Sequence, residues 1–359
     1  MTDARFGSGP PFTLGVEEEL FLVDPVTGGQ ANSGAAVIER LGEVPGRITQ
    51  ELHACQVELI TDPTRTVGEA VDALGTMRQA VLATGAGLLG AGTHPSAIEG
   101  AAKITDKDRY ERIRDLIGDA AVTAVGGLHV HIGMPDADTA VRVFNRLRTH
   151  LPLLSALAAN SPFRHGRDTG LACARDVTMR AWPRSGVPRA LTDFDDFCQL
   201  SRLLTRAAGV SDYTWFWWKL RPHPRLGTVE VRALDAQASL LDTAAIVALT
   251  HCLARAAADA APAPEWPPEL VEEGMFRASR FGTAAELPDH EGRPQPLMEV
   301  LAEALALAHP YASELGCEQE LALLPELATR GGGAGRQRRF YEIAGMDALL
   351  RDLTALTAA

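Results

Sequence analysis

The sequence predicts an α+β protein with a mostly antiparallel sheet and helices packed on one side of it. Three segments, at residues 12–23, 127–134 and 228–234, alternate between apolar and charged side chains, as strands with one buried face do. Helical patterns lie among these segments without following every strand, so the strict strand–helix–strand order of a parallel sheet is absent. From about residue 269 the composition is helical. We therefore expect mixed strands and helices first and a helical layer at the C-terminal end.

The first predicted strand shows the alternation most clearly. Leu14, Val16 and Leu20 fall on one face by the two-residue period of a strand. Glu17 and Glu19 fall together on the opposite face. We expect the apolar face to meet helices and the acidic face to remain accessible.

The later elements follow from helical periodicity and capping patterns. Apolar residues at the spacing of an amphipathic helix predict helices at 67–84 and 138–159. Thr192 and Ser239, each followed three residues later by Asp, predict capping boxes that open helices reaching residues 207 and 259. The other expected elements are an extended segment at 48–60, a long ordered loop with short strands at 160–188 and a loop at Gly331–Gly335.

The length permits one large domain, and we expect a single domain over residues 1–359. Its sheet-bearing core would occupy residues 12–260, and residues 269–359 would form a helical part of the same domain. The proline-rich stretch Pro262–Pro268 is the best candidate for a boundary between the two parts.

Composition narrows the classes of function. The formal net charge of -12 and the pI near 5.3 argue against nucleic acid or an anionic membrane as a partner, because both need clustered Lys and Arg. The sequence contains no stretch of 18 consecutive apolar residues, the length that would suggest a membrane span. Five scattered cysteines without a C-x-x-C pair, and an N-terminal stretch without the apolar run of a signal peptide, lead us to expect a cytoplasmic protein.

Charged side chains on the three strands indicate a ligand site. They are Glu17, Glu19, His129, His131, Glu230 and Arg232. A sheet face with this content does not pack against a core, since unpaired buried charge costs several kcal/mol per group. An exposed acidic strand, half-buried strand histidines and a cross-strand ion pair would each explain one segment alone. Together, the segments predict that a cation lies between the carboxylates.

Two details of the acidic pattern require a structural solution. Strict alternation points Glu18 toward the core, where it needs an Arg partner, a bulge or an edge position. Glu51 and Glu58 lie seven positions apart and would occupy opposite faces of a straight strand. Only a turn or bulge between them would bring both to one site, and this pair alone favours a surface location.

Guanidinium groups near the acids suggest recognition of phosphate or carboxylate. Arg221 and Arg225 precede the third strand, and the 160–188 segment adds Arg164, Arg167, Arg175 and Arg180 beside Asp168. No G-x-x-x-x-G-K-[ST] motif is present. A G-x-G-x-x-G match at residues 85–90 follows a helix, the reverse of the context that binds pyrophosphate, so we interpret it as a helix stop.

A set of motifs stands in a fixed order along the chain: TLGVEEEL, ELHACQVE, GTHP, GLHVHIGM, ANSPFRHGRDTG, WWKLRPHPRLGTVEVRALDA, RASRFG and AGRQRRFYE. Together they resemble the type 2 glutamate-cysteine ligase family of bacterial carboxylate-amine ligases. The resemblance covers Thr13 to about Tyr341. It implies a glutamine-synthetase-like catalytic fold, with a curved sheet whose concave face holds ATP and divalent metal ions.

The resemblance also implies residue roles. The metal cage would consist of Glu17, Glu19, Glu51, Glu58, His129 and Glu230. His131, Arg221 and Arg232 would contact the ATP phosphates or the acid substrate, and Glu19, Arg221 and Arg232 would take part in catalysis. Two departures stand out: Lys219 occupies a position where relatives commonly have Asp, and Gly274-Met275-Phe276 replaces Asn-Lys-Trp.

The function implied is an ATP-dependent ligase that joins a small carboxylate, such as glutamate, to an amine through an acyl phosphate. Mg²⁺ or Mn²⁺ is the expected metal because the ligands are mostly hard oxygens. A homodimer is compatible with the family and with the helical C-terminal layer. The alternatives are an ATP-dependent phosphotransferase of the same fold, a metal-dependent hydrolase built on His129-x-His131, and a non-catalytic relative, which the intact cage disfavours.

Overall fold

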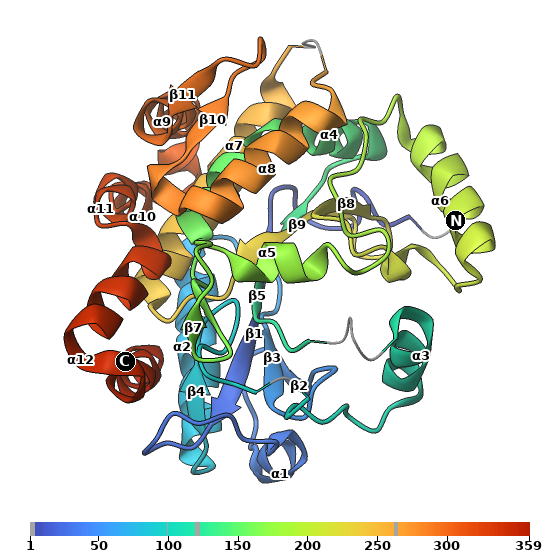
Figure 1. The fold of residues 1–359 in the computed structure, drawn as a ribbon. Coiled ribbons are helices and arrows are strands. Elements are labelled where there is room, and N and C mark those ends of the chain that lie inside the picture. The colour runs from blue at the N-terminus through green and yellow to red at the C-terminus, as the bar shows by residue number, and fades with distance from the viewer. Residues whose placement is uncertain (1–3, 99, 119–122, 262–264) are drawn as a thin grey trace.

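The computed structural model describes residues 4–98, 100–118, 123–261 and 265–359. Within them, seven strands form one sheet, and every pairing in it is antiparallel. In spatial order the strands are β2 (Arg47–Gln50), β3 (Gln56–Ile60), β1 (Leu14–Val23), β5 (Gly127–Gly133), β9 (Thr228–Asp235) and β8 (Leu220–His223), with β4 (Gly87–Leu89) paired to the end of β1. The expected antiparallel α+β architecture is confirmed (Figure 1).

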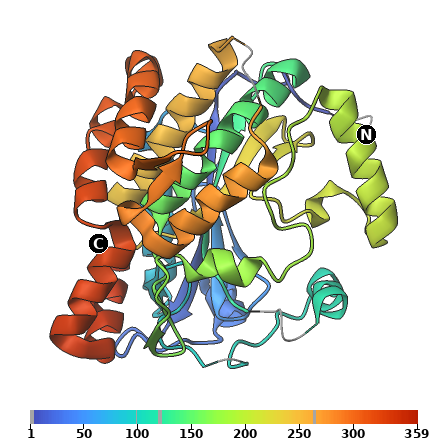
Figure 2. The same cartoon turned by 45° about the horizontal axis from the view of Figure 1, so that its top comes forward.

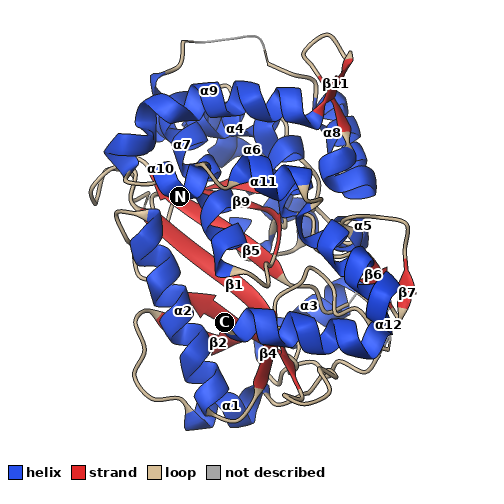
Figure 3. Ribbon diagram, turned by 90° about the vertical axis from the view of Figure 1, so that its left-hand side faces the viewer, coloured by secondary structure: helices blue, strands red, loops and turns tan. Residues whose placement is uncertain are grey.

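One face of the sheet is covered by three helices, seen beside the strands in Figure 3. They are α2 (Val67–Ala83), α4 (Ala137–Ala158) and α7 (Leu240–Asp259). Leu14, Val16 and Leu20 of β1 are completely buried in the core that these helices share with the sheet. This burial removes the apolar face of β1 from water and leaves the face with Glu17 and Glu19 on the other side.

Glu18 points into the helix-covered side, as strict alternation predicts, and it has the Arg partner that the sequence required. Its carboxylate is fully buried and receives two hydrogen bonds from Arg78 of α2, at 2.9 and 2.8 Å. Thr243 of α7 donates a third at 2.9 Å. The middle acid of the Glu17-Glu18-Glu19 run therefore ties the central strand to two helices.

The C-terminal part is mostly helical and lies along one side of the molecule (Figures 1 and 2). Its helices are α8 (Pro268–Phe281), α9 (Leu297–Leu315), α10 (Glu318–Leu321), α11 (Leu324–Thr329) and α12 (Gly332–Ala358). The largest cluster of buried apolar residues runs from β1 to α11, so the sheet and the C-terminal helices share one core. This supports the proposal of a single domain. Part of the candidate boundary, residues 262–264, lies outside the described residues.

Helix α7 passes the length and hydropathy test for a membrane span, which the sequence did not suggest. However, 72% of its apolar window is buried inside the protein, between α4 and α9. We attribute its hydrophobicity to core packing.

Several local predictions were wrong. Helix α6 (Phe194–Ala208) is capped by Asp193 rather than Thr192, and Ser239 makes no side-chain cap to α7. The 160–188 segment holds the short hairpin β6 (Phe163–Arg164) and β7 (Arg167–Asp168), but also an unexpected helix, α5 (Ala174–Met179). The helices α1 (Gly34–Arg40) and α3 (Asp108–Ile117) and the hairpin β10 (Glu286–Pro288) and β11 (Pro294–Pro296) were also not expected.

Candidate functional site

The open face of the sheet collects the acids and imidazoles that the sequence singled out. Sheet register decides which of them meet across neighbouring strands. Directly opposed pairs are Glu17 with His129, Glu19 with Glu58, and His131 with Glu230. Because each pair faces away from the helices, the three pairs form one polar surface across β3, β1, β5 and β9.

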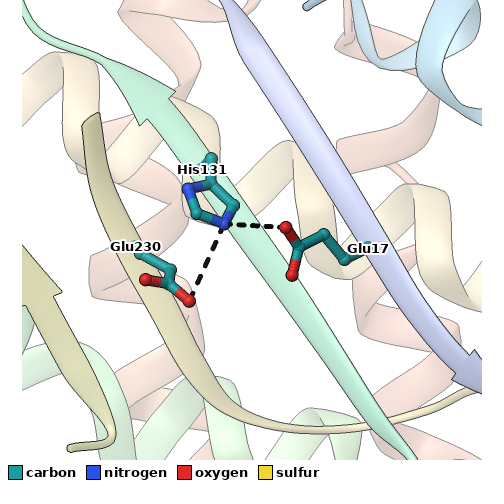
Figure 4. Close-up of side chains that lie close together, drawn as sticks. All are labelled: Glu17, His131 and Glu230. Carbon is teal, nitrogen blue, oxygen red and sulfur yellow. Dashed lines mark ion pairs between the residues drawn. The ribbon is translucent and has the colours of Figure 1, made fainter. Parts of the chain in front are cut away.

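His131 lies between two carboxylates from neighbouring strands (Figure 4). Its Nε2 lies 3.3 Å from Glu17 Oε1 and 3.7 Å from Glu230 Oε1. Its Nδ1 lies 3.0 Å from the hydroxyl of Thr228, which fixes the orientation of the ring. One ligand atom from each of Glu17, His131 and Glu230 lies within 4.8 Å of the others, close enough to hold one cation.

His129 forms the next group along β5. Its Nδ1 lies 3.0 Å from Glu17 Oε2, and its Nε2 lies 3.6 Å from Glu19 Oε1. Glu17, Glu58 and His129 form a second set of ligand atoms within 4.8 Å. Glu17 thus belongs to two adjacent sets, which allows neighbouring cations to share its carboxylate.

Glu51 and Glu58 reach the same site because a turn separates them. Strand β2 ends at Gln50, the chain reverses, and β3 begins at Gln56, with the Glu51 N–H donating to the Gln56 carbonyl at 3.4 Å. Both acids then lie beside Glu19, and these three form a third set within 4.8 Å. The chain therefore has the turn between Glu51 and Glu58 that the sequence analysis required for both acids to reach one site.

For the acids at this end of the site, the positive charge of Arg232 is outweighed by burial and by neighbouring acids. Burial and the negative charge of Glu19 raise the pKa of Glu51 to about 7. Burial, together with Glu51 and Glu17, raises the pKa of Glu58 well above its ordinary value. Carboxyl groups held this close resist ionisation unless a cation joins them.

The other end of the site is electrostatically balanced. Burial opposes the ionisation of Glu17, but His131 and His129 outweigh it and hold the pKa well below its usual range. Burial likewise opposes ionisation of Glu230, while Arg221 and Arg232 outweigh it and lower its pKa. Glu17 and Glu230 therefore have basic partners in the protein, whereas Glu51 and Glu58 lie mainly beside other acids.

Two arginines hold Glu230 from either side. Arg221 on β8 donates from Nε to Glu230 Oε2 at 2.5 Å, and Arg232 on β9 pairs with Oε1. Burial lowers the pKa of Arg232, but Glu230 outweighs burial and raises it, so this guanidinium stays charged. All nine predicted site residues line one cavity of about 620 Å³.

The cavity wall includes residues that the sequence did not single out as site residues. Lys107 and Tyr110 come from the start of α3, and Trp217 precedes β8. Of the arginines noted in the 160–188 segment, Arg175 lines this cavity, whereas Arg180 pairs with Glu272. Asp168, noted beside them, pairs with Arg338. Strand periodicity does not identify such residues, because their elements are short or irregular.

The two departures from the family pattern lie outside the lining of this cavity. Lys219 is buried and pairs with Asp176 of α5, and burial lowers its pKa to about 8. Gly274 of α8 packs on Pro152 of α4, where an added Cβ would lie 2.8 Å from the proline ring. Both positions therefore serve contacts between elements.

Fold and site together define a glutamine-synthetase-like catalytic sheet, and solved structures share its fold. A bifunctional glutathione synthetase from Pasteurella multocida matches with a TM-score of 0.72 and 16% identity, over 97% of this chain and 52% of that one. A glutamate–cysteine ligase from Francisella tularensis in complex with AMP matches with a TM-score of 0.71 and 13% identity, over 97% and 89% of the two chains. At these identities the matches show the fold alone.

The sequence assigns the family. The family described as "Glutamate-cysteine ligase family 2(GCS2)" matches residues 13–352. A Rubrobacter xylanophilus protein named "Putative glutamate--cysteine ligase 2-3" is 42% identical over 344 residues, which is 94% of each chain. A Gloeobacter violaceus protein named "Putative glutamate--cysteine ligase 2" is 33% identical over 98% of each chain. The chain belongs to glutamate-cysteine ligase family 2.

Proposed function

We propose that this protein is an ATP-dependent carboxylate–amine ligase that forms an amide bond through an acyl phosphate. Glutamate as the acid and cysteine as the amine are the substrates that the names of the relatives suggest. The observation that carries the proposal is the single surface on which three overlapping sets of ligand atoms adjoin Arg221 and Arg232. Such a surface can hold cations and anionic oxygen atoms side by side.

The donor set fits hard divalent ions. Five carboxylates and His129, with His131 adjacent, offer mostly oxygen ligands, and none of the three sets contains a cysteine. The raised pKa values of Glu51 and Glu58 show a local deficit of positive charge that a divalent ion would remove. We therefore propose that Glu17, Glu19, Glu51, Glu58, His129 and Glu230 hold Mg²⁺ or Mn²⁺. When bound, these ions would neutralise phosphate oxygens.

Amide formation in water requires activation of the carboxylate. A carboxylate oxygen of the acid would attack the γ-phosphorus of ATP, releasing ADP and giving an acyl phosphate. The amine nitrogen would then attack the carbonyl carbon, phosphate would leave, and the nitrogen would lose a proton. We propose that Arg232 and Arg221, which pair with Glu230 and line the cavity, stabilise the negative oxygens that develop in both steps.

A second cavity supports a reaction between two substrates. It measures about 410 Å³ and shares Glu17 and His131 with the first cavity. Its other lining residues come largely from the N-terminal segment and from the ends of β5 and β9. Two substrates could therefore approach the acid–imidazole surface from different directions and meet at Glu17.

The test is ADP release by the purified protein with Mg²⁺, ATP, glutamate and a panel of amines. We expect amine-dependent ADP and an amide product by mass spectrometry, both abolished by Glu19→Gln. Glu43→Gln, at an exposed position, is the matched control and should behave as the parent protein does. A stable phosphorylated product without amide would replace the proposal with the phosphotransferase, and hydrolysis without nucleotide would replace it with the hydrolase.

Assembly and location belong to the same proposal. We infer a homodimer and a cytoplasmic site of action from the family and from the composition. Light scattering of the purified protein and fractionation of the source cells would test these two points separately from the activity.

A further inference from the structure

Arg175 occupies a fixed position on the rim of the acid–imidazole surface. It belongs to α5, and its backbone N–H donates to the Ser161 hydroxyl at 3.2 Å, which itself donates to Asp235 at 2.7 Å. The next residue, Asp176, pairs with Lys219 and accepts a hydrogen bond from Ser279 at 2.8 Å. Helix α5 is thus anchored to β9, to the start of β8 and to α8.

The guanidinium of Arg175 is buried but incompletely bonded. The residue is 6% exposed and lines the 620 Å³ cavity. Its Nη2 donates to the carbonyl of Arg232 at 3.2 Å, whereas its Nε has no hydrogen-bond partner among the described residues. A buried guanidinium nitrogen without a partner is costly, and at the wall of a cavity it indicates a ligand.

The position of Gly127 shows what Arg175 faces. A Cβ on Gly127 would lie 2.6 Å from Arg175 Nη2, 2.8 Å from Glu19 Oε2 and 3.0 Å from His129 Nε2. The guanidinium, the carboxylate and the imidazole therefore converge over this glycine. In the described part of the chain no ion pair joins Arg175 to Glu19, so the guanidinium keeps donors for another anion.

We propose that Arg175 binds an anionic oxygen of the reacting group, carried by the transferred phosphoryl group or by the substrate carboxylate. The proposal deepens the ligase function and rests on it. Arg175, Glu19 and His129 all line the same cavity, so an anionic oxygen bound by Arg175 from the cavity would lie beside the Glu19 end of the proposed metal cage. A guanidinium suits this place because it is planar, always charged and donates several hydrogen bonds in a fixed geometry.

The kinetic test compares Arg175→Gln and Arg175→Lys with Arg202→Gln, which changes an exposed arginine of α6. We expect Arg175→Gln to lower kcat 100-fold or more, as loss of an oxyanion donor does. Arg175→Lys should keep only part of the activity, and Arg202→Gln should keep all of it. A selective rise in KM for ATP assigns the oxygen to the phosphoryl group, and a selective rise in KM for the acid assigns it to the carboxylate. Partial rescue of Arg175→Gln by added guanidinium ion would support direct contact.

A binding test separates this inference from the ligase proposal. Calorimetry with Mg²⁺–ATP, and with Mg²⁺ plus glutamate, needs no turnover, and at least one of these should bind Arg175→Gln 10-fold or more weakly than the parent protein. Unchanged binding together with kcat and KM within threefold of the parent would overturn the inference. The inference would also be overturned if Arg175→Gln and Arg175→Lys lost activity and binding equally, with a lowered Tm in both, and if guanidinium ion did not restore the activity of Arg175→Gln. Absence of amide formation by the parent protein would overturn the ligase proposal alone.

Discussion

Glu51→Gln should stabilise the metal-free protein, because Glu51 is held where its charge is unfavourable. Its pKa is raised from 4.5 to about 7 by burial and by Glu19. One pKa unit corresponds to ~1.4 kcal/mol, so the ionised carboxylate costs up to about 3 kcal/mol at pH 8. Because the folded protein holds the Glu51 proton more tightly than the unfolded chain does, this group costs no stability below pH 4.5. Its cost grows as the pH rises from 4.5 through about 7. The gain from Glu51→Gln should therefore be largest at pH 8 and below about 1 kcal/mol at pH 5.

The amide of Gln keeps one structural contact of Glu51. The carboxylate Oε2 accepts a hydrogen bond from the backbone N–H of Leu52 at 2.6 Å, and the Gln carbonyl oxygen can accept the same bond. The change in unfolding free energy caused by Glu51→Gln therefore does not include the loss of that hydrogen bond.

The assay is urea unfolding at pH 5 and pH 8, with EDTA or with Mg²⁺. Saturating Mg²⁺ at about 100 times its Kd should stabilise the parent protein by ~2.7 kcal/mol and Glu51→Gln by clearly less. Mg²⁺ should also stabilise the parent protein more at pH 8 than at pH 5, because protons compete for its ligands. Glu43→Gln, which removes an exposed carboxylate, controls for the change in net charge. If Glu51→Gln is less stable than the parent at pH 8 in EDTA, the electrostatic reasoning is wrong.

Three further changes test other contacts. Arg78→Met leaves Glu18 buried without its partner and should lower the free energy of unfolding in urea by about 3–5 kcal/mol. Adding Glu18→Gln to this variant should restore much of the loss. Equal losses in the single and double variants would contradict this. Gly127→Ala places a Cβ 2.6 Å from a guanidinium nitrogen, so steady-state kinetics should show at least a 10-fold lower kcat with little change in Tm. Lys219→Asp puts a carboxylate beside buried Asp176 and should lower Tm far more than Lys219→Met; the reverse order would refute the assigned pair.

The acidic half of the site could be predicted from the sequence because its residues follow the two-residue alternation of a strand. Alternation alone placed Glu17 and Glu19 on one face and required a partner for Glu18, and the structure has both features. It could not supply the register that sets Glu19 opposite Glu58 or Glu17 opposite His129. Register depends on pairing between segments distant in the chain, which a local pattern does not encode.

Other features escaped sequence analysis because tertiary packing overrides local preference. The glycine run at 331–335 suggested a loop, yet α12 begins at Gly332. A Cβ on Gly333 would lie 2.3 Å from Asn160 Oδ1, so the glycines allow this helix to approach Asn160 closely. Helix α5 has six residues, too few to show a helical period, so the sequence grouped Arg175 with the other arginines of the 160–188 segment and did not distinguish it from them.

The three consecutive glutamates of β1 explain how a destabilising site is tolerated. Glu17 and Glu19 face the acid–imidazole surface, while Glu18 faces Arg78 on the other side of the same strand. Arg78 also donates to the backbone carbonyls of Gln237 and Ala238, at 2.9 and 2.8 Å, so the ion pair links β1, α2 and the segment after β9. Repulsion among the acids of the acid–imidazole surface would push their strands apart. The buried Glu18–Arg78 pair opposes this because it joins the central strand β1 to helix α2. The same strand can therefore hold closely spaced carboxylates in the arrangement that the proposed metal site requires.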